Sequence, residues 1–202
     1  AGHDLKELKA ARKNSDKGKN YFKEVMLKCS KLMQSIVNNP KPVIAEVAGV
    51  ATAAGCQLVA SCDLAYAGES ARFATPGVNI GLFCSTPMVA LSRNVSNKHS
   101  MEMLLTGDLI SSSKAAEIGL INKMINDNDL QNFVLERALK ISKKSAITLK
   151  IGKEAFYKQI DMTLTEAYDY ASNVMVENML KLDAEEGIGA FIDKRKPKWQ
   201  DK

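Results

Sequence analysis

The chain has 202 residues, of which 46% are hydrophobic and 25% are charged, and its formal net charge is +5. This composition is that of a globular chain with room for a sizeable core, and it excludes a chain that is disordered throughout. The small positive excess fits a ligand with phosphate groups and equally fits an ordinary basic surface. No apolar run reaches the length that spans a bilayer, so we expect no membrane segment.

The first residues carry no initiator methionine, secretory core or transit-peptide character, so we interpret the start as lying inside a longer protein, with its targeting segment not present here. Residues 4–20 are rich in lysine and predict a turn or short helix followed by an exposed loop. Apolar residues spaced by three and four predict an amphipathic helix over 21–37. The segment Asn38-Asn39-Pro40 ends it.

The next segment predicts a strand, a turn and a helix. Residues 42–49 indicate a strand that runs into a tight turn, small residues fill 51–55, and a helix follows over about 56–62. The later elements are expected in this order: strands over 64–67 and 72–74, loops over 75–77 and 84–87, helices over 88–93, 100–105 and 114–118 with Ser111-Ser112-Ser113 as the cap of the last one, and a strand over 120–125. A helical pattern then runs from 129 to about 183, and residues 187–202 predict a short helix with a basic end.

Four cysteines stand at spacings that match no zinc-binding pattern: Cys29, Cys56, Cys62 and Cys84. We expect free, buried thiols in a reducing compartment and no metal site.

The segment 42–62 carries the strongest chemical signal. The first amides of a helix have no partner inside the helix, and small residues leave those N–H groups open to a ligand oxygen. Such a turn can hold an anion or an oxyanion. Small residues at a helix start more often indicate close packing alone, so both interpretations stay open at this point.

Several segments resemble, in the same order, those of the crotonase (enoyl-CoA hydratase/isomerase) family: Ala1 to Leu8, Lys41 to Gly49, Ala53 to Leu58 with Cys62-Asp63, Phe73 to Pro76, Met103 to Gly107, Ala115 to Ile121 and Phe191 to Lys196. The resemblance implies an α/β fold, the crotonase (ClpP-like) spiral of ββα turns, without its N-terminal part. Residues 1–128 would form the spiral core and residues 129–202 a helical trimerisation region.

The resemblance also implies a site for an acyl-CoA thioester. The backbone amides of His3 and Ala54 would form an oxyanion hole, and His3, Asp4, Leu5 and Lys6 would lie along the coenzyme A. Lys194 would reach a coenzyme A phosphate from a neighbouring subunit, although a solvated charge run explains it equally well. Coenzyme A would enter only as part of the substrate, with no separate cofactor. A homotrimer or hexamer, a mitochondrial location and a role in fatty acid metabolism are implied in the same way.

The chain departs from the family where hydratases carry two glutamates. These positions are Gln57 and Gly77, and neither residue can act as a base. We therefore expect ordinary hydration to be severely impaired, and we expect Gln57→Glu with Gly77→Glu to restore some of it. Cys84, Ser85 and Thr86 follow the second position and are interpreted as packing residues rather than nucleophiles.

Three other polar residues are interpreted without a catalytic role for their side chains. The amide of His3 is expected to matter more than its ring, His99 is predicted in a surface loop, and Glu46 is predicted to face solvent or a partner rather than the thioester.

Three functions remain open. The chain is an enzyme of the lyase class, or of a related reaction such as hydrolysis or decarboxylation, or it is a non-catalytic acyl-CoA-binding protein. Nucleic-acid binding ranks last, because its basic residues lack interleaved aromatic side chains: Lys6, Lys9, Arg12, Lys13, Lys17, Lys19 and Lys23.

Overall fold

The computed structural model describes residues 2–202, so Ala1 of the predicted first motif lies outside the described residues. The chain divides into two compact units. The first comprises residues up to Val37 and Val43–Val134, and the second comprises Asn38–Pro42 and Leu135–Lys202. The division between them falls inside one helix, α7 (Leu130–Ser142). The predicted domain boundary at residues 128 and 129 stays a prediction.

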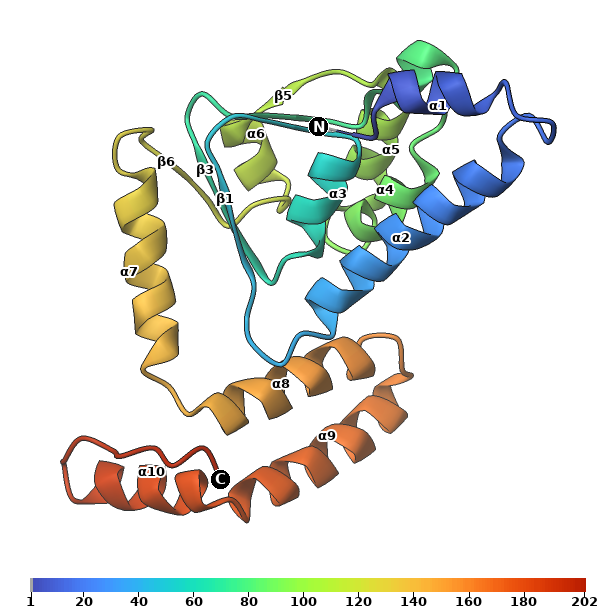
Figure 1. Cartoon of the computed structure of the whole chain (residues 1–202). Coiled ribbons are helices and arrows are strands. Elements are labelled where there is room, and N and C mark those ends of the chain that lie inside the picture. Colours follow the sequence, from blue (N-terminus) through green and yellow to red (C-terminus); the bar gives the residue numbers. More distant parts are fainter. Residues whose placement is uncertain (1) are drawn as a thin grey trace. The chain divides into compact units, whose positions relative to one another are not determined.

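The first unit is built on two small sheets with parallel pairing. In one sheet the order is β1 (Ile44–Val47), β3 (Leu64–Gly68) and β6 (Lys123–Ile125), all parallel (Figure 1). In the other the order is β2 (Val50–Thr52), β4 (Arg72–Ala74) and β5 (Ile110–Ser111), and only β5 is antiparallel. In the first two turns the chain adds one strand to each sheet before a helix follows, as in the predicted ββα spiral, and in the third turn α6 stands between β5 and β6.

Helices enclose these sheets. They are α1 (Leu5–Ala11), α2 (Lys19–Val37), α3 (Ala54–Ser61), the 3₁₀ helix η1 (Pro76–Ile80), α4 (Ser85–Leu91), α5 (Asn97–Thr106) and α6 (Ser112–Glu117). Helix α3 packs against both α2 and α4 (Figure 1). The core between them centres on Phe73, Leu91 and Leu104, which are almost fully buried. Burial of such side chains stabilises a fold by roughly 1.5–3 kcal/mol each.

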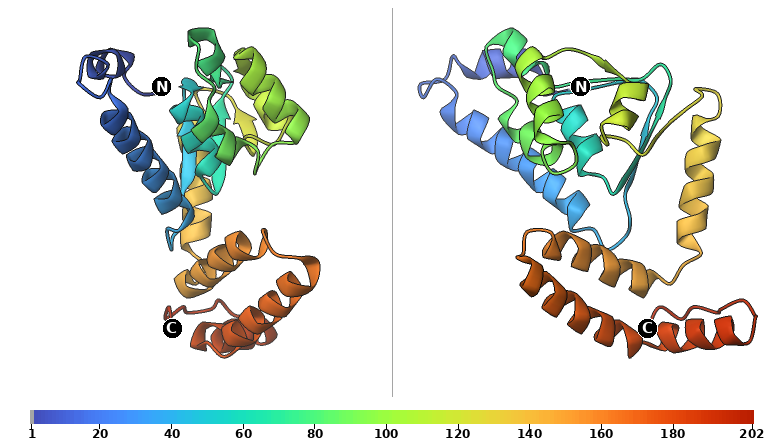
Figure 2. Two further views of the ribbon diagram at one scale, coloured as in Figure 1. Left: turned by 90° about the vertical axis from the view of Figure 1, so that its right-hand side faces the viewer. Right: turned by 180° about the vertical axis from the view of Figure 1, so that it is seen from behind.

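The second unit is helical, with α8 (Ala146–Gln159), α9 (Leu164–Met179) and α10 (Leu182–Ile192) after the end of α7. Helices α8 and α9 lie side by side as a helical hairpin (Figure 2).

Residues 193–202 form an irregular C-terminal segment that is fastened to α10. Asp183, 2% exposed, accepts hydrogen bonds from the amides of Gln200 (2.7 Å) and Asp201 (3.1 Å). Glu186 accepts hydrogen bonds from the two terminal guanidinium nitrogens of Arg195, Nη1 and Nη2, at 2.7 and 2.8 Å. The predicted helix over 187–202 was wrong in its bounds, because the helix starts at Leu182 and these polar contacts replace helical ones after Ile192.

Other predicted bounds also change. A strand, β2, occupies Val50–Thr52, where the sequence predicted only a turn of small residues. Helix α3 begins at Ala54 rather than Cys56. Helix α4 begins at Ser85 inside the predicted loop 84–87, because Pro87 falls in the first turn, where a missing N–H breaks no helical bond.

The structure also tests the predicted positions of Glu46 and His99. Glu46 is exposed, as predicted. His99 is in the first turn of α5 rather than in a loop. Among residues 2–202, no helix combines the length and the apolar character that crossing a membrane requires.

Candidate functional site

The turn before α3 leaves the first amides of that helix without a capping side chain. Ala53 is the N-cap, and no side chain caps the helix there. Its backbone has φ 50° and ψ −117°, a region that residues with a Cβ rarely adopt. Such a conformation costs on the order of 1–3 kcal/mol and persists where the surroundings impose it. Here the Ala53 amide donates to the Ala74 carbonyl at 3.0 Å, which ties the turn to the end of β4.

Ala54 is the first residue of the helix, and its φ is not positive. The position therefore accepts a side chain and does not require glycine. Within residues 2–202 its amide donates to no recorded partner. The residue is only half-buried.

The loop at the start of the chain lies against this turn. A Cβ atom on Gly2 would sit 3.0 Å from the Cβ of Ala53 and 3.9 Å from the amide nitrogen of Ala54. Two segments that are about fifty positions apart in the sequence are therefore in van der Waals contact. His3, which follows Gly2 directly, is half-buried, and its amide too has no recorded partner among the described residues. The structure thus places Gly2, the residue before His3, against the turn that precedes Ala54, and the convergence of the His3 and Ala54 amides on one oxygen stays a prediction.

The residues after His3 start helix α1. Asp4 is its N-cap, and its carboxylate accepts the amide of Lys6 at 2.7 Å. Leu5 is 53% exposed and Lys6 is exposed. All three directly follow the Gly2-His3 loop in the sequence, and their predicted contacts with coenzyme A stay predictions.

Gln57, at the first acid position, is one helical turn after Ala54 and is 5% exposed. Its side-chain Oε1 accepts a hydrogen bond from the Cys29 thiol of α2 at 3.6 Å. Burial raises the pKa of Cys29, so the thiol keeps its proton at neutral pH. No local pattern indicates this contact, because Cys29 and Gln57 lie on different helices and are 28 positions apart in the sequence.

Gly77, at the second acid position, is buried in η1, and the loop after it closes back onto it. A Cβ here would lie 2.7 Å from the Leu82 carbonyl oxygen and 2.9 Å from the Cys84 Sγ. The Leu82 amide donates to the Gly77 carbonyl at 2.9 Å, and the Gly77 amide donates to Cys84 Sγ at 3.3 Å. Glycine is therefore a steric requirement of this loop. The expectation that Gly77→Glu simply restores an acid is revised, because the loop would have to move.

The four cysteines are free, as predicted, but only Cys56 and Cys84 are buried. Burial, with a smaller contribution from Cys84, raises the pKa of Cys56 to about 12. A thiol with so high a pKa is a packing group rather than a nucleophile. Thr75, fully buried just before η1, carries the one enclosed side-chain hydroxyl without a hydrogen-bond partner among residues 2–202.

Lys194 belongs to the second unit. It follows α10 at a positive φ of 54° and is exposed. No hydrogen bond or ion pair is recorded for its side chain within the described residues. Its predicted contact with a coenzyme A phosphate stays a prediction.

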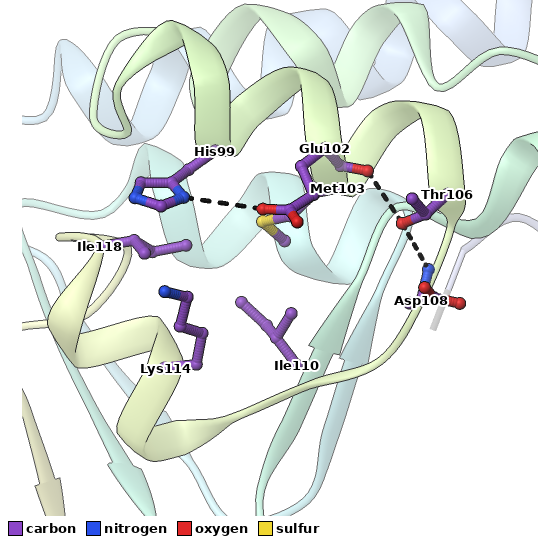
Figure 3. Close-up of a pocket in the computed structure, with 8 residues that line it drawn as sticks. All are labelled: His99, Glu102, Met103, Thr106, Asp108, Ile110, Lys114 and Ile118. Carbon is purple, nitrogen blue, oxygen red and sulfur yellow. Dashed lines mark hydrogen bonds and ion pairs between the residues drawn. The ribbon is translucent and has the colours of Figure 1, made fainter.

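A cavity of about 170 Å³ opens elsewhere in the first unit, between α5, β5 and α6 (Figure 3). Met103, Ile110 and Ile118 line it, with His99, Glu102, Thr106, Asp108 and Lys114 around them. His99 Nδ1 lies 3.7 Å from Glu102 Oε2. The cavity is smaller than the roughly 300–1,000 Å³ of typical ligand pockets, and none of the predicted site residues lines it. No cluster of three metal-ligating side chains occurs among the described residues.

Comparison with known proteins gives a consistent result. The chain matches the family described as Enoyl-CoA hydratase/isomerase over residues 1–202. It is 51% identical over 199 residues to Enoyl-CoA hydratase domain-containing protein 3, mitochondrial, of Xenopus laevis, and 50% identical to the human protein of that name. These alignments cover 98% of this chain but 66% and 64% of the relatives, so the chain spans a little under two thirds of their length.

Solved structures agree in fold. The crystal structure of human enoyl Coenzyme A hydratase domain-containing protein 3 superposes with a TM-score of 0.93 at 50% identity, covering 98% of this chain and 77% of that one. An enoyl-CoA hydratase of Mycobacterium smegmatis gives a TM-score of 0.92 at 45% identity, covering 98% and 76%.

Proposed function

Because this chain belongs to the enoyl-CoA hydratase/isomerase family, we propose that it binds an acyl-CoA thioester and that the amides of His3 and Ala54 hold the thioester oxygen. The observation that supports this most directly is the contact between the Gly2-His3 loop and the uncapped turn at Ala53. Both amides lack partners within residues 2–202, and an amide in that condition favours an acceptor oxygen from a ligand.

The chemical contribution of this site is stabilisation of negative charge on the thioester oxygen as an enolate or tetrahedral species forms. Partial positive charge at the start of α3 adds to the two N–H groups. Residues at the two acid positions supply no proton transfer, since Gln57 is an amide and Gly77 has no side chain. A positioned acid or base contributes about 10²–10⁴ in rate, so hydration of crotonyl-CoA is expected to be slow by at least that factor. Thioester hydrolysis and decarboxylation remain within the reach of such a site.

A non-catalytic acyl-CoA-binding protein is the second candidate, and the loop at Gly77 favours it. That loop closes on itself through the Leu82 amide and the Cys84 thiol, which leaves no room for an acid at the second position. Binding through backbone amides needs neither acid.

The wider setting is proposed from the family. We place the protein in fatty acid metabolism in the mitochondrion, with coenzyme A contacts from Asp4, Leu5 and Lys6 and from Lys194 of a neighbouring subunit. Apolar side chains on the helices of the second unit support a homotrimer or hexamer: Leu164 75%, Leu180 74%, Phe191 86% and Ile192 71% exposed.

The experiment removes one N–H group; the ester also weakens the Ala53 carbonyl, which accepts the Gln57 amide at 3.0 Å, so the control has to share that second effect. Substitution of Ala54 by lactic acid replaces the amide by an ester, and we measure binding and turnover over a panel of acyl-CoA thioesters. The matched control replaces Leu164, the first residue of α9, by its hydroxy acid, because that amide also begins a helix. The Ala54 ester is expected to weaken binding roughly 2- to 10-fold, as for one hydrogen bond, and any turnover by about 10²–10³.

The outcomes of this experiment distinguish the two candidate functions from each other and from the failure of both. Binding without turnover across the panel supports the non-catalytic candidate. Equal affinity for the Ala54 ester and the unmodified chain contradicts the proposed site.

A further inference from the structure

The turn between α1 and α2 carries most of the positive charge of the chain. Residues 4–28 contain eight basic and four acidic side chains, a net charge of +4, while the whole chain has +5. This turn lies at the periphery of the first unit (Figures 1 and 2). Five exposed lysines define a lysine turn: Lys9, Lys13, Lys17, Lys19 and Lys23.

The acidic side chains of this segment are engaged by other groups. Asp16 accepts the amides of Gly18 and Asn20, both at 2.9 Å, at the start of α2. The other three acids have these partners: the Lys6 amide for Asp4 (2.7 Å), the Tyr21 hydroxyl for Glu7 (2.9 Å) and the Lys28 ammonium for Glu24 (2.6 Å). Within the described residues, no hydrogen bond or ion pair is recorded for the side chains of the lysine turn. Its five charges therefore have no ion-pair partner in that part of the chain.

The turn is folded tightly, which holds these charges within a short segment. A Cβ on Gly18 would lie 2.8 Å from the ring of Phe22 and 3.0 Å from the carbonyl of Ala11, so the end of α1 packs against the start of α2. Lys17 has φ 57°, a left-handed conformation that is strained for a residue with a Cβ. Arg12 lies over the Phe22 ring at 5.7 Å and is thus occupied within the protein.

Helix stability does not explain these lysines. Lys19 is the first residue of α2 and Lys23 stands four positions later, so two like charges lie on one side of the helix. The start of a helix is its positive end, where cations are unfavourable, and α2 has no acidic residue in its first turn. The arrangement lowers the stability of α2 and favours an anionic partner.

An exposed apolar side chain continues this side of α2. Leu27 follows Lys23 by four positions and is 51% exposed. Lysines beside an exposed leucine match the two parts of a lipid surface, the charged headgroups and the apolar layer below them. We propose that the lysine turn, together with Leu27, binds the anionic surface of a lipid membrane. This surface is separate from the proposed acyl-CoA contacts and does not depend on them.

The same residues favour a lipid surface over a nucleic acid. Binding of single strands relies on aromatic rings on which bases stack. The two rings of this segment, Tyr21 and Phe22, are half-buried, and Glu7 and Arg12 engage them. The free cations are all lysines, which are point charges without the planar fork that arginine presents to phosphates.

The test measures partition of the whole 202-residue chain onto vesicles by flotation. Vesicles of phosphatidylcholine are compared with vesicles in which about one third of the lipid is phosphatidylglycerol. At low salt the anionic vesicles are expected to bind the chain at least about 100-fold more strongly, because each lysine near an anionic surface contributes about fivefold. Salt at about 1 M is expected to remove most of this difference.

Three substitutions locate the binding surface. The triple variant Lys13→Gln, Lys17→Gln and Lys19→Gln is expected to lose roughly 100-fold in affinity for the anionic vesicles. The matched control makes the same change in net charge at three exposed lysines of the second unit and is expected to bind like the original chain: Lys140→Gln, Lys143→Gln and Lys144→Gln. Circular dichroism checks that both variants are folded.

Leu27 separates lipid binding from binding of a soluble polyanion. Leu27→Ser is expected to weaken binding to anionic vesicles roughly threefold, because part of an apolar side chain no longer enters the lipid. It is expected to leave binding of single-stranded poly-dT unchanged. Leu105→Ser, at a 59% exposed position of α5, is the control and is expected to change neither.

Three results overturn the inference. One is partition that does not depend on phosphatidylglycerol, and another is an equal loss of affinity in the triple variant and its control, which would show attraction by net charge alone. The third is binding of poly-dT without binding of vesicles, which would assign the lysine turn to nucleic acid. None of them bears on the proposed acyl-CoA site, which is tested by the Ala54 ester.

Discussion

Gly2 and Ala53 approach each other closely: a Cβ on Gly2 would lie 3.0 Å from the Cβ of Ala53, so even a methyl group at Gly2 would force a small shift. Ala53 also holds a positive φ that normally belongs to glycine. The candidate oxyanion site therefore depends on one glycine for close approach and on one strained alanine for the direction of the chain.

This contact predicts coupled effects of two small substitutions. Gly2→Ala is expected to weaken butyryl-CoA binding, because the loop must move away from the turn. Ala53→Gly removes the opposing methyl group and the strained φ, so its unfolding free energy should stay within about 1 kcal/mol of the original chain. The double variant is expected to regain most of the affinity, and a double-mutant cycle measures the coupling. Strictly additive changes in binding would count against the contact.

The loop at Gly77 predicts a steric penalty rather than a gain of function. Gly77→Ala is expected to lower the free energy of unfolding by about 1–3 kcal/mol, since a Cβ meets a backbone oxygen and a packed thiol. Gly49→Ala is the control, because a Cβ there meets nothing within 4 Å. Chemical denaturation measures both. Equal stability of the two variants would show that the loop opens freely and would restore Gly77→Glu as a way to add an acid.

Much of the site was predictable from the sequence because local patterns determine it. A strand, a run of small residues and a helix over 42–62 predict open backbone amides near Ala54, and the structure has them. Strand β2 was missed because Val50–Thr52 is too short to show a pattern, and its pairing with β4 decides its conformation.

Patterns within a short stretch of sequence do not predict side-chain contacts between residues that are far apart in the chain. Nothing local indicates that Cys29 reaches Gln57, or that Cys84 fills the space beside Gly77. The C-terminal segment was predicted helical, and the prediction was wrong because the segment's polar anchors, Asp183 and Glu186, lie on the preceding helix and leave no pattern in the segment itself.

Those anchors predict that acid releases the C-terminal segment. The hydrogen bond from Arg195, followed by that from the Lys198 amide, lowers the pKa of Glu186 from 4.5 to about 2. Burial acts to raise the pKa of Asp183, but hydrogen bonds from Ser145, Gln200 and Asp201 outweigh it, so the net shift is also downward. A lowered folded-state pKa means that the stabilisation is complete above about pH 4.5 and is lost as the pH falls toward 2.

Trp199, the single tryptophan, reports this release directly, because its Nε1 donates to the Lys143 carbonyl at 2.8 Å. Its fluorescence is expected to change between pH 4.5 and 2. Glu186→Gln should release the segment at higher pH, while Glu185→Gln, at an exposed neighbour, should follow the original chain. A fluorescence signal that is the same for Glu186→Gln and the original chain throughout this range would refute the anchor role.

The exposed apolar side chains of the second unit predict self-association through α10. Phe191 is 86% exposed, and Ile192 beside it is 71% exposed, which is unusual for a helix that faces only water. If they meet another copy of the chain, Phe191 is an aromatic anchor of the kind that contributes 2 kcal/mol or more to an interface, or about 30-fold in affinity.

Phe191→Asp is therefore expected to weaken association by about that factor in sedimentation equilibrium, while the unfolding free energy of the dissociated chain changes by no more than about 0.5 kcal/mol. Leu105→Asp places the same charge at an exposed apolar position of the first unit, 59% exposed, and is expected to leave association unchanged. A chain that sediments as a monomer before any substitution, or a Phe191→Asp variant that associates as strongly as the original, would remove α10 from the proposed interface.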